Sequence, residues 1–201
     1  ERASVSPRPE RVHRRMSRRQ ADWVLAEYPF ALDRFQLEAI EAIDAGGHVV
    51  VAAPTGSGKT VVAEYGIELM RQRGLRAFYT APLKALSNQK YRDLTTRHGV
   101  GEVGLLTGDN AVDGDAPIVV MTTEVLRNMI YARSPALARL GLVVLDEVHF
   151  LQDAYRGPVW EEVIIHLPDA VRLVSLSATV SNAEEFGEWL VAVRGDNQIV
   201  L

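Results

Sequence analysis

The sequence predicts an α/β protein built on a mostly parallel sheet, with helices covering both faces. Short apolar runs rich in β-branched residues alternate along the chain with segments of helical, amphipathic spacing. That alternation is typical of parallel strands joined by crossover helices. Each polar motif described below directly follows one of these apolar runs. Because ligands bind beyond the carboxyl ends of such strands, we expect the motifs to meet at one edge of the sheet.

The composition of the chain excludes several classes of protein. The chain has 201 residues, 47% of them hydrophobic, which is enough for one sizeable core. No apolar run approaches the roughly 18 residues that cross a bilayer, and no signal-peptide pattern opens the chain, so we expect no membrane partner. The absence of cysteine allows a reducing compartment, and we expect a cytoplasmic protein. The chain starts at Glu1 and ends in apolar residues, so we also expect a piece of something longer.

The net charge of −4 is unevenly distributed. Residues 1–20 carry seven arginines against two glutamates, a local charge of +5, which leaves −9 for the rest. This segment lacks apolar periodicity and contains Pro7 and Pro9, so we predict a disordered basic tail. It is either an arm for nucleic acid or simply solvated. The acidic remainder argues against general electrostatic binding of nucleic acid, so any such contact must be local.

Two helices are expected before the first strand. Residues 21–30 form a short one, and Asp33 is a typical N-cap for the next, with Gln36 three residues later. Gly46 and Gly47 end this second helix and lead into the apolar run 49–53. We therefore expect a buried strand to begin immediately after the glycines.

A glycine-rich turn follows that strand. It comprises Pro54, Thr55, Gly56, Ser57, Gly58, Lys59 and Thr60, with Ala53 where the usual pattern has its first glycine. Gly56 and Gly58 let backbone N–H groups point at phosphate oxygens, at the positive end of the next helix. Lys59 can approach the β- and γ-phosphates, and the Thr60 hydroxyl can bind Mg²⁺. The alternative is an ordinary turn, but the pattern predicts a site for a nucleoside triphosphate such as ATP.

The remaining chain repeats the strand-and-helix unit. Further strands are expected at 77–80, 103–106, 118–121, 142–145 and 173–176, with helices over 60–73, after 81–90, through 129 and over 182–190. A buried stripe on the helix 60–73 is expected from Val61, Val62, Tyr65, Leu69 and Met70. We expect Trp160 and Trp189 to pack against helices and not to stack on bases.

Two carboxylates, Asp146 and Glu147, follow the apolar run 142–145 directly. Asp146 is the better candidate to hold Mg²⁺ through water, since this ion keeps much of its hydration. Glu147 can then orient and deprotonate the water that attacks the γ-phosphate, and it is also a candidate metal ligand together with Thr60 and Asp146. The alternative is an acidic strand end that faces solvent.

Three further polar residues follow strands near the nucleotide motifs. His149 is either a packing histidine or a hydrogen-bonding link between ATP and neighbouring structure. Ser177 and Thr179 are either ordinary strand-end hydroxyls or a connection from the ATP site to the rest of an enzyme. We interpret all three as coupling residues.

The motifs resemble, in order, those of superfamily-two helicases of the DExH-box type. They are the segments 53–60, 81–90, 107–109, 122–129, 146–149 and 177–179. The sequences DEVH (146–149), PLKALSNQKY (82–91), TTEVLRNM (122–129) and RGPVWEE (156–162) are similar to the Ski-like class, which includes exosome-associated RNA helicases. The resemblance covers about residues 28–201.

The resemblance implies a RecA-like P-loop domain over residues 21–201 and an ATP-dependent helicase that acts on single-stranded nucleic acid, RNA in preference to DNA. It implies that Gln36 reads the adenine edge, that Phe30 stacks on the base, and that Lys59 and Glu147 are catalytic. Residues implied to line the strand path are Pro82, Lys84, Ala85, Gly108, Thr122 and Thr123. The alternative for Lys84 is a solvated surface lysine.

Such helicases use a second RecA-like domain in cis, which carries arginines that complete the ATP site. This chain holds no such domain, so we expect it to bind nucleotide but to hydrolyse and unwind little. Two rival classes stay open: a DNA-directed superfamily-two translocase, and a nucleotide-binding adaptor without motor activity.

Overall fold

The computed structural model describes residues 28, 31–148, 157–178, 183–195 and 197–200. The fold below concerns the compact unit Asp33–Leu201. Several predicted features lie outside the described residues: the basic tail 1–20, most of the helix at 21–30, and the site residues Phe30, His149 and Thr179.

Within the described residues, eight strands form one sheet with the order β4-β3-β5-β2-β6-β7-β1-β8. The strands are β1 (His48–Ala52), β2 (Arg76–Ala81), β3 (Val103–Leu106), β4 (Ala111–Val112), β5 (Ile118–Thr122), β6 (Leu140–Leu145), β7 (Arg172–Ser177) and β8 (Asn197–Val200). All neighbours pair in parallel except β3 and β4. Every strand expected from the sequence is present, and the predicted mostly parallel sheet is confirmed.

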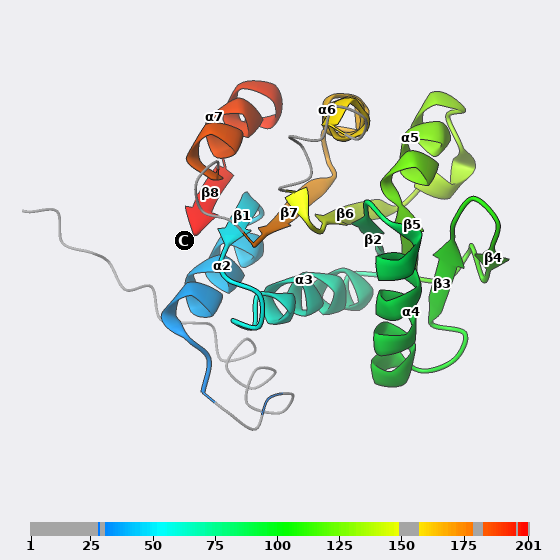
Figure 1. Ribbon diagram of the computed structural model, residues 1–201, viewed down its shortest axis with the longest axis horizontal. Helices are drawn as coiled ribbons and strands as arrows, with labels where there is room; N and C mark the ends of the chain where they lie inside the picture. The colour runs from blue at the N-terminus through cyan, green and yellow to red at the C-terminus, as the bar shows by residue number, and fades with distance from the viewer. Residues whose placement is uncertain (1–27, 29–30, 149–156, 179–182, 196, 201) are drawn as a thin grey trace, which may run out of the picture. The chain divides into compact units, whose positions relative to one another are not determined.

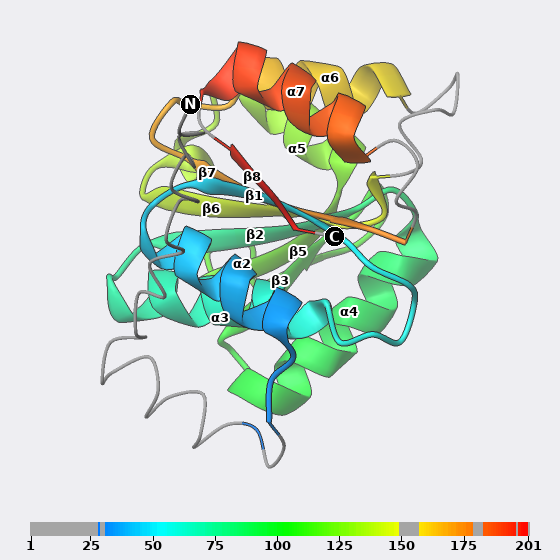
Figure 2. The same cartoon turned by 90° about the vertical axis from the view of Figure 1, so that its left-hand side faces the viewer.

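Helices cover both faces of the sheet, as Figures 1 and 2 show. One layer contains α2 (Arg34–Asp44), α3 (Thr60–Gln72) and α4 (Lys84–His98), and the other contains α5 (Thr123–Tyr131), α6 (Gly157–His166) and α7 (Ala183–Arg194). A short 3₁₀ turn, η1 (Pro135–Leu137), precedes β6. Among the helices of the described residues, none is long and apolar enough to cross a membrane.

The central strands are buried on both faces, which explains why their sequences read as continuous apolar runs. Every residue of β1 and of β6 is buried. The core between the sheet and α5–α7 is built around Trp160, whose side chain is fully buried. Trp189 packs at the border of this core with its ring stacked on Phe186, the centroids 6.2 Å apart. The packing role expected for both tryptophans is confirmed.

The buried stripe of α3 is wider than expected. Leu69 is only partly buried, whereas Ala63, Gly66 and Ile67 are buried although the prediction omits them. The reason is that α3 packs against α2 as well as against β2 and β6. A helix with two neighbours buries more than the single stripe of a surface helix.

Candidate functional site

The carboxyl ends of the parallel strands share one edge of the sheet, which lies on the right in Figure 2. The loop 54–59 follows β1, Pro82 follows β2, Asp146 follows β6, and Ser177 ends β7. These four strands are consecutive across the sheet, in the order β2-β6-β7-β1. The structure therefore brings the predicted motifs to one rim.

The loop 54–59 adopts a backbone that requires its glycines. Gly56 has φ +84° and Gly58 has φ +88°, a left-handed conformation that residues with a Cβ rarely adopt. The loop is anchored to the neighbouring strand, because the Ala53 N–H donates to the Ser177 carbonyl at 3.1 Å. Pro54, Thr55 and Gly56 are exposed at the rim. An open, glycine-shaped turn that ends at a helix N-terminus fits a phosphate group.

Lys59 lies at the N-terminus of α3, directly before Thr60. Its Nζ donates to the Ala53 carbonyl at 3.0 Å, so the ammonium folds back over the loop that it terminates. A polyphosphate seated in the loop would therefore meet both the ammonium and the positive end of the helix dipole. The residues present fit a bound triphosphate.

Gln36 connects the first described helix to this loop. Its Oε1 accepts from the Asp33 N–H at 2.7 Å, which is one half of the expected capping box, and its Nε2 donates to the Gly58 carbonyl at 2.9 Å. The side chain is only 3% exposed. The sequence predicts the contact with Asp33 and the contact with adenine, but not the hydrogen bond that Gln36 donates to Gly58 of the loop. Contact with adenine stays a prediction.

Asp146 and the loop are two strands apart at the same edge. The strands β6 and β1 both pair with β7, so their axes are separated by about 10 Å. Alternation along β6 places Asp146 on the face of Leu142 and Val144, and Leu142 lies close to Gly66 of α3. The Asp146 side chain is thus on the α3 side of the sheet, where Lys59 and Thr60 also lie.

The carboxylate of Asp146 is held from two directions. Its Oδ1 accepts from the Glu147 N–H at 2.8 Å, and its Oδ2 accepts from the Tyr79 hydroxyl. Glu147 has φ +58°, an uncommon backbone for a residue with a side chain. Such outliers persist where surrounding contacts enforce them, and they concentrate at functional sites. Asp146 and Glu147 are both half-buried.

Tyr79 is a residue of this site that the sequence analysis missed. It lies within β2, is 1% exposed, and donates its hydroxyl to Asp146. Burial, followed by the negative charge of Asp146, raises the pKa of Tyr79 well above its usual value, so the phenol keeps its proton. The sequence signal is a tyrosine that follows Phe78 within the strand Arg76–Ala81, which packing alone could explain.

The chemistry of the oxygen donors fits Mg²⁺ carried in with a nucleotide. Among the described residues no cluster of three or more His, Asp or Glu side chains could hold a metal by itself. Mg²⁺ is usually bound by one or two protein groups together with phosphate oxygens and water. The Thr60 hydroxyl and the Asp146 carboxylate would be those groups, with Glu147 beside them.

The residues expected to line the strand path lie along the same rim, on the β2, β3 and β5 side. Lys84, Ala85 and Gly108 are exposed, and Pro82 and Thr122 are half-buried. The Lys84 Nζ forms an ion pair with Asp109, which lies in the turn between β3 and β4. The lysine expected to hold a phosphate is therefore already paired with a carboxylate.

Thr123 differs from the expectation of an exposed contact. Its side chain is 3% exposed, and its hydroxyl donates to the Ala81 carbonyl at 3.4 Å. The hydroxyl thus links the start of α5 to the end of β2. The sequence could not reveal this, because Thr122 and Thr123 are adjacent and identical, and only the backbone decides which one faces inward.

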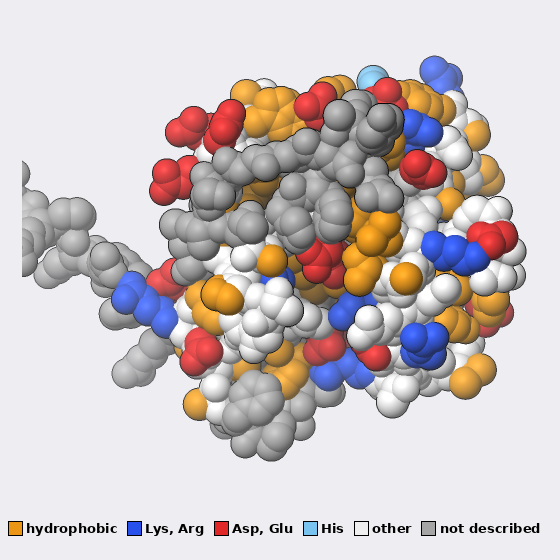
Figure 3. Space-filling view, in the orientation of Figure 1, with side chains coloured by type: hydrophobic (Ala, Val, Ile, Leu, Met, Phe, Trp, Pro, Cys, Tyr) orange, Lys and Arg blue, Asp and Glu red, His pale blue; other side chains and the backbone are white. Residues whose placement is uncertain are grey.

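Charges of both signs lie side by side on this edge of the molecule. Figure 3 looks onto it: basic and acidic side chains alternate over the described surface, and no broad basic area is visible. This agrees with the acidic charge of residues 21–201 and limits any attraction for nucleic acid to local contacts.

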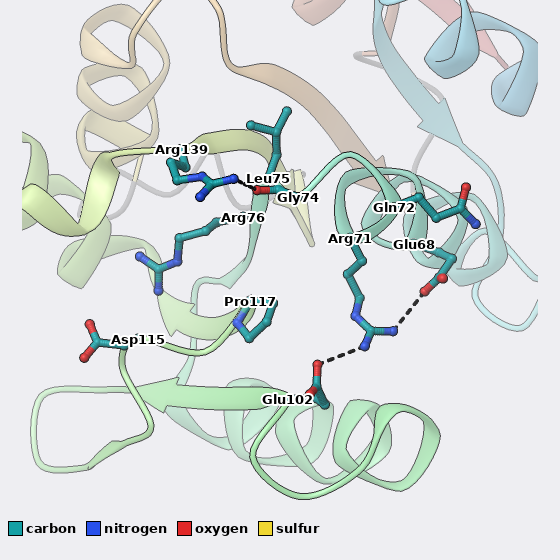
Figure 4. Close-up of a pocket in the computed structure, with 10 residues that line it drawn as sticks. All are labelled: Glu68, Arg71, Gln72, Gly74, Leu75, Arg76, Glu102, Asp115, Pro117 and Arg139. Carbon is teal, nitrogen blue, oxygen red and sulfur yellow. Dashed lines mark hydrogen bonds and ion pairs between the residues drawn. The ribbon is translucent and has the colours of Figure 1, made fainter.

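A hollow of about 530 Å³ lies at the opposite edge of the sheet, away from these motifs (Figure 4). Its lining includes Arg76 at the start of β2, Glu102 just before β3, and Arg139 just before β6. The Arg71 guanidinium bridges Glu68 and Glu102, at 3.2 and 2.9 Å. Because these arginines already bind carboxylates or carbonyls of the protein, we interpret the hollow as structural.

A strand–loop–helix phosphate site with an Asp-Glu pair two strands away defines a P-loop nucleotide-binding domain of RecA-like fold. The DEAD/DEAH box helicase family matches residues 33–186, most of the chain, and the chain belongs to this family.

Curated relatives agree. The chain is 63% identical over 182 residues to "Probable helicase HelY" of Mycobacterium tuberculosis (strain ATCC 25618 / H37Rv), covering 90% of this chain and 20% of that protein. It is 49% identical over 164 residues to "Exosome RNA helicase MTR4" of Homo sapiens, covering 82% and 16%. It is 48% identical over 185 residues to the chloroplastic "DExH-box ATP-dependent RNA helicase DExH15" of Arabidopsis thaliana, covering 89% and 16%. The chain thus spans about a fifth or less of these relatives.

A solved structure shows the same fold. The crystal structure of the DUF1998 helicase MrfA bound to DNA superposes with a TM-score of 0.74 at 22% identity, covering 100% of this chain and 31% of that one. At this identity the likeness shows the architecture alone.

Proposed function

We propose that this chain is the first ATP-binding domain of an ATP-dependent RNA helicase. The observation that carries the proposal is the placement of Lys59 and the Asp146–Glu147 pair at one edge of the sheet, two strands apart, with Asp146 on the α3 side. A gap of about 10 Å between the strand axes leaves room for a magnesium-bound triphosphate tail. An adaptor that only binds nucleotide has no need of the second carboxylate.

Each residue has a separate role in the proposed reaction. Backbone N–H groups of the loop and the Lys59 ammonium bind the phosphates, and Thr60 with Asp146 holds Mg²⁺. When bound there, the ion would supply positive charge against the negative charge that develops on the transferred phosphoryl group. Glu147 accepts the proton of the attacking water. Phe30 and Gln36 would contact the adenine, and Gln36 would have to give up its bond to Asp33 or to Gly58 to do so.

The residues of the proposed strand path favour a motor that binds a nucleic-acid strand without recognising its base sequence. Pro82, Lys84, Ala85, Gly108 and Thr122 offer backbone amides, one hydroxyl and one ammonium, which can bind phosphates and sugars without contacting base edges. The preference for RNA is supported by the relatives whose names specify RNA helicases. Comparing RNA with DNA as stimulators of the intact enzyme tests it; stimulation by DNA alone would favour the translocase alternative.

Ser177 supports the proposed coupling between nucleotide and the rest of the enzyme. Its carbonyl accepts a hydrogen bond from the Ala53 N–H, so a shift of the phosphate loop would also move the end of β7. His149 and Thr179 are proposed to act with it. ATP binding would then close this domain and a second RecA-like domain on a strand, a ligand-driven population shift.

Two substitutions in the intact enzyme test the proposal. Lys59→Ala should abolish ATP binding, because the loop loses its cation. Glu147→Gln should retain binding and lower turnover by at least about a hundredfold, because the amide cannot accept the proton. Binding is measured by equilibrium titration with ATP and turnover by phosphate release. A Glu147→Gln enzyme that hydrolyses ATP at the parent rate would disprove the assignment of the base.

A further inference from the structure

We propose that Tyr79 is a positioning residue that fixes the Asp146 carboxylate in the orientation required for Mg²⁺. The inference rests on the proposed function, because it concerns how the metal-binding carboxylate of that site is held. Tyr79 itself does not touch the nucleotide or the metal; it acts through Asp146.

The strand β2 holds Asp146 through both backbone and side chain. The Asp146 N–H donates to the Thr80 carbonyl at 2.9 Å, and the Tyr79 hydroxyl donates to Asp146 Oδ2. Tyr79 pairs in register with Val144, two residues before Asp146, so its ring extends along the sheet surface toward the rim. The carboxylate is thereby tied to the strand on its far side from the phosphate loop.

The hydroxyl completes a restraint that the backbone alone cannot provide. The Glu147 N–H holds Oδ1 at 2.8 Å, but one contact leaves the carboxylate free to rotate about its broad terminal torsion. With Tyr79 on Oδ2, both oxygens are held, and each keeps a lone pair for the water shell of a metal. Outer partners of this kind typically tune metal affinity by 10- to 100-fold.

The ring of Tyr79 is itself fixed from the other side. The Lys90 Nζ lies 5.3 Å from its centroid, within the range of a cation–π contact. Lys90 belongs to α4, the helix that begins at Lys84 on the strand path. Tyr79 thus lies between the helix of the strand path and the carboxylate of the metal site.

Tyr79→Phe tests the inference, because it removes the hydroxyl and keeps the ring against Lys90. The affinity of the full chain for N-methylanthraniloyl-ADP is titrated with Mg²⁺ and again in EDTA. We expect the gain in affinity caused by Mg²⁺ to fall about tenfold in the variant, with the metal-free affinity unchanged. Raising the Mg²⁺ concentration should restore the lost affinity.

Tyr65→Phe is the matched control. The Tyr65 hydroxyl donates to Asp44 Oδ1 at 2.9 Å, so this variant loses the same kind of buried tyrosine–aspartate bond away from the rim. Its dependence on Mg²⁺ should equal that of the parent.

Four outcomes overturn the inference. If Mg²⁺ raises the nucleotide affinity of Tyr79→Phe as much as that of the parent, the role of Tyr79 is disproved while the proposed function stands. The same holds if Tyr65→Phe loses as much of the Mg²⁺ effect as Tyr79→Phe. A Tyr79→Phe chain that no longer folds shows that the hydroxyl serves stability instead. If the nucleotide affinity of the parent chain does not depend on Mg²⁺, Asp146 does not bind the metal, and the proposed site is disproved as well.

Discussion

Asp109 forms an ion pair with Lys84, the lysine that the proposed strand path needs for binding phosphate. Its carboxylate, in the turn between β3 and β4, pairs with Lys84 at the start of α4, and both side chains are exposed. The turn is ordered, because the Thr107 N–H donates to the Asn110 carbonyl at 2.9 Å. A phosphate of a nucleic-acid strand would have to compete with this carboxylate, so we expect the pair to lower the affinity of the proposed strand path for nucleic acid.

Asp109→Asn should strengthen binding of single-stranded RNA a few-fold, because an exposed ion pair of modest strength no longer competes. The slope of log affinity against log salt should steepen by about one, since Lys84 then neutralises a phosphate fully. Fluorescence anisotropy with a short labelled RNA at several salt concentrations measures both. Lys84→Ala should show the opposite change, and weaker binding by Asp109→Asn would instead make Asp109 a support for Lys84.

His48 makes stability depend on pH. It is 2% exposed, its Nδ1 accepts from the Leu173 N–H at 3.0 Å, and burial, then Arg194 and Arg172, lower its pKa to about 4. In the unfolded chain, His48 has its ordinary pKa of 6.5. The contribution of neutral His48 to stability is therefore fully present above pH 6.5 and is lost as the pH falls toward 4. The loss should reach about 3 kcal/mol.

Urea unfolding at pH 7 and at pH 4.5 measures this effect. In His48→Gln, whose amide oxygen can still accept from Leu173, the difference in unfolding free energy between the two pH values should shrink by about 2 kcal/mol, most of the histidine contribution. Carboxylates titrate alike in parent and variant, so the comparison isolates His48. Equal slopes in the two proteins would show that His48 does not carry the effect.

The phosphate loop is the element where backbone conformation and side-chain packing act together. Gly58→Ala should lower the free energy of unfolding by about 1–3 kcal/mol, because φ +88° disfavours alanine and its Cβ would lie 2.6 Å from Gln36 Nε2. It should also weaken nucleotide binding by displacing Gln36. Thermal unfolding and nucleotide titration measure the two effects.

Gly56→Ala is the natural comparison for that prediction. Its φ of +84° is similar, but nothing lies within 4 Å of an added Cβ. Gly56→Ala should therefore be the milder change in stability. Equal losses in the two variants would show that Gln36 moves aside easily and that backbone strain alone sets the cost.

The elements that the sequence predicted are those with a strong pattern. The buried strands β1 and β6 contain continuous apolar runs, β2 contains the shorter run 77–79, and α2 begins at the expected N-cap. By contrast, β4 has two exposed residues and no pattern to detect. In the site, the described motif residues lie at one rim as expected, and the roles assigned to them stay predictions. The contacts of Tyr79 and Thr123 depend on how β2 lies beside β6 and α5, which no local pattern records.

At the scale of the whole molecule, this chain spans about a fifth of the length of its HelY relatives. We expect residues 1–201 alone to bind nucleotide and to hydrolyse ATP at least about a thousandfold more slowly than the intact enzyme, because in the proposed mechanism a second RecA-like domain supplies arginines to the ATP site. Phosphate-release assays with and without RNA, on both proteins at equal concentration, measure the ratio. Strong RNA-stimulated hydrolysis by the isolated chain would contradict the two-domain mechanism.

Within the described residues, one edge of the sheet is β4, two residues that run antiparallel to β3. A β-strand from another copy of the protein could pair there with only two residues of backbone. Because β4 is antiparallel to β3, it also breaks the parallel order of the sheet at this edge. Short edge strands are a common protection against sheets joining one another. Crowded copies of this protein should therefore not polymerise through that side, which leaves the neighbouring turn around Asp109 accessible even at high concentration.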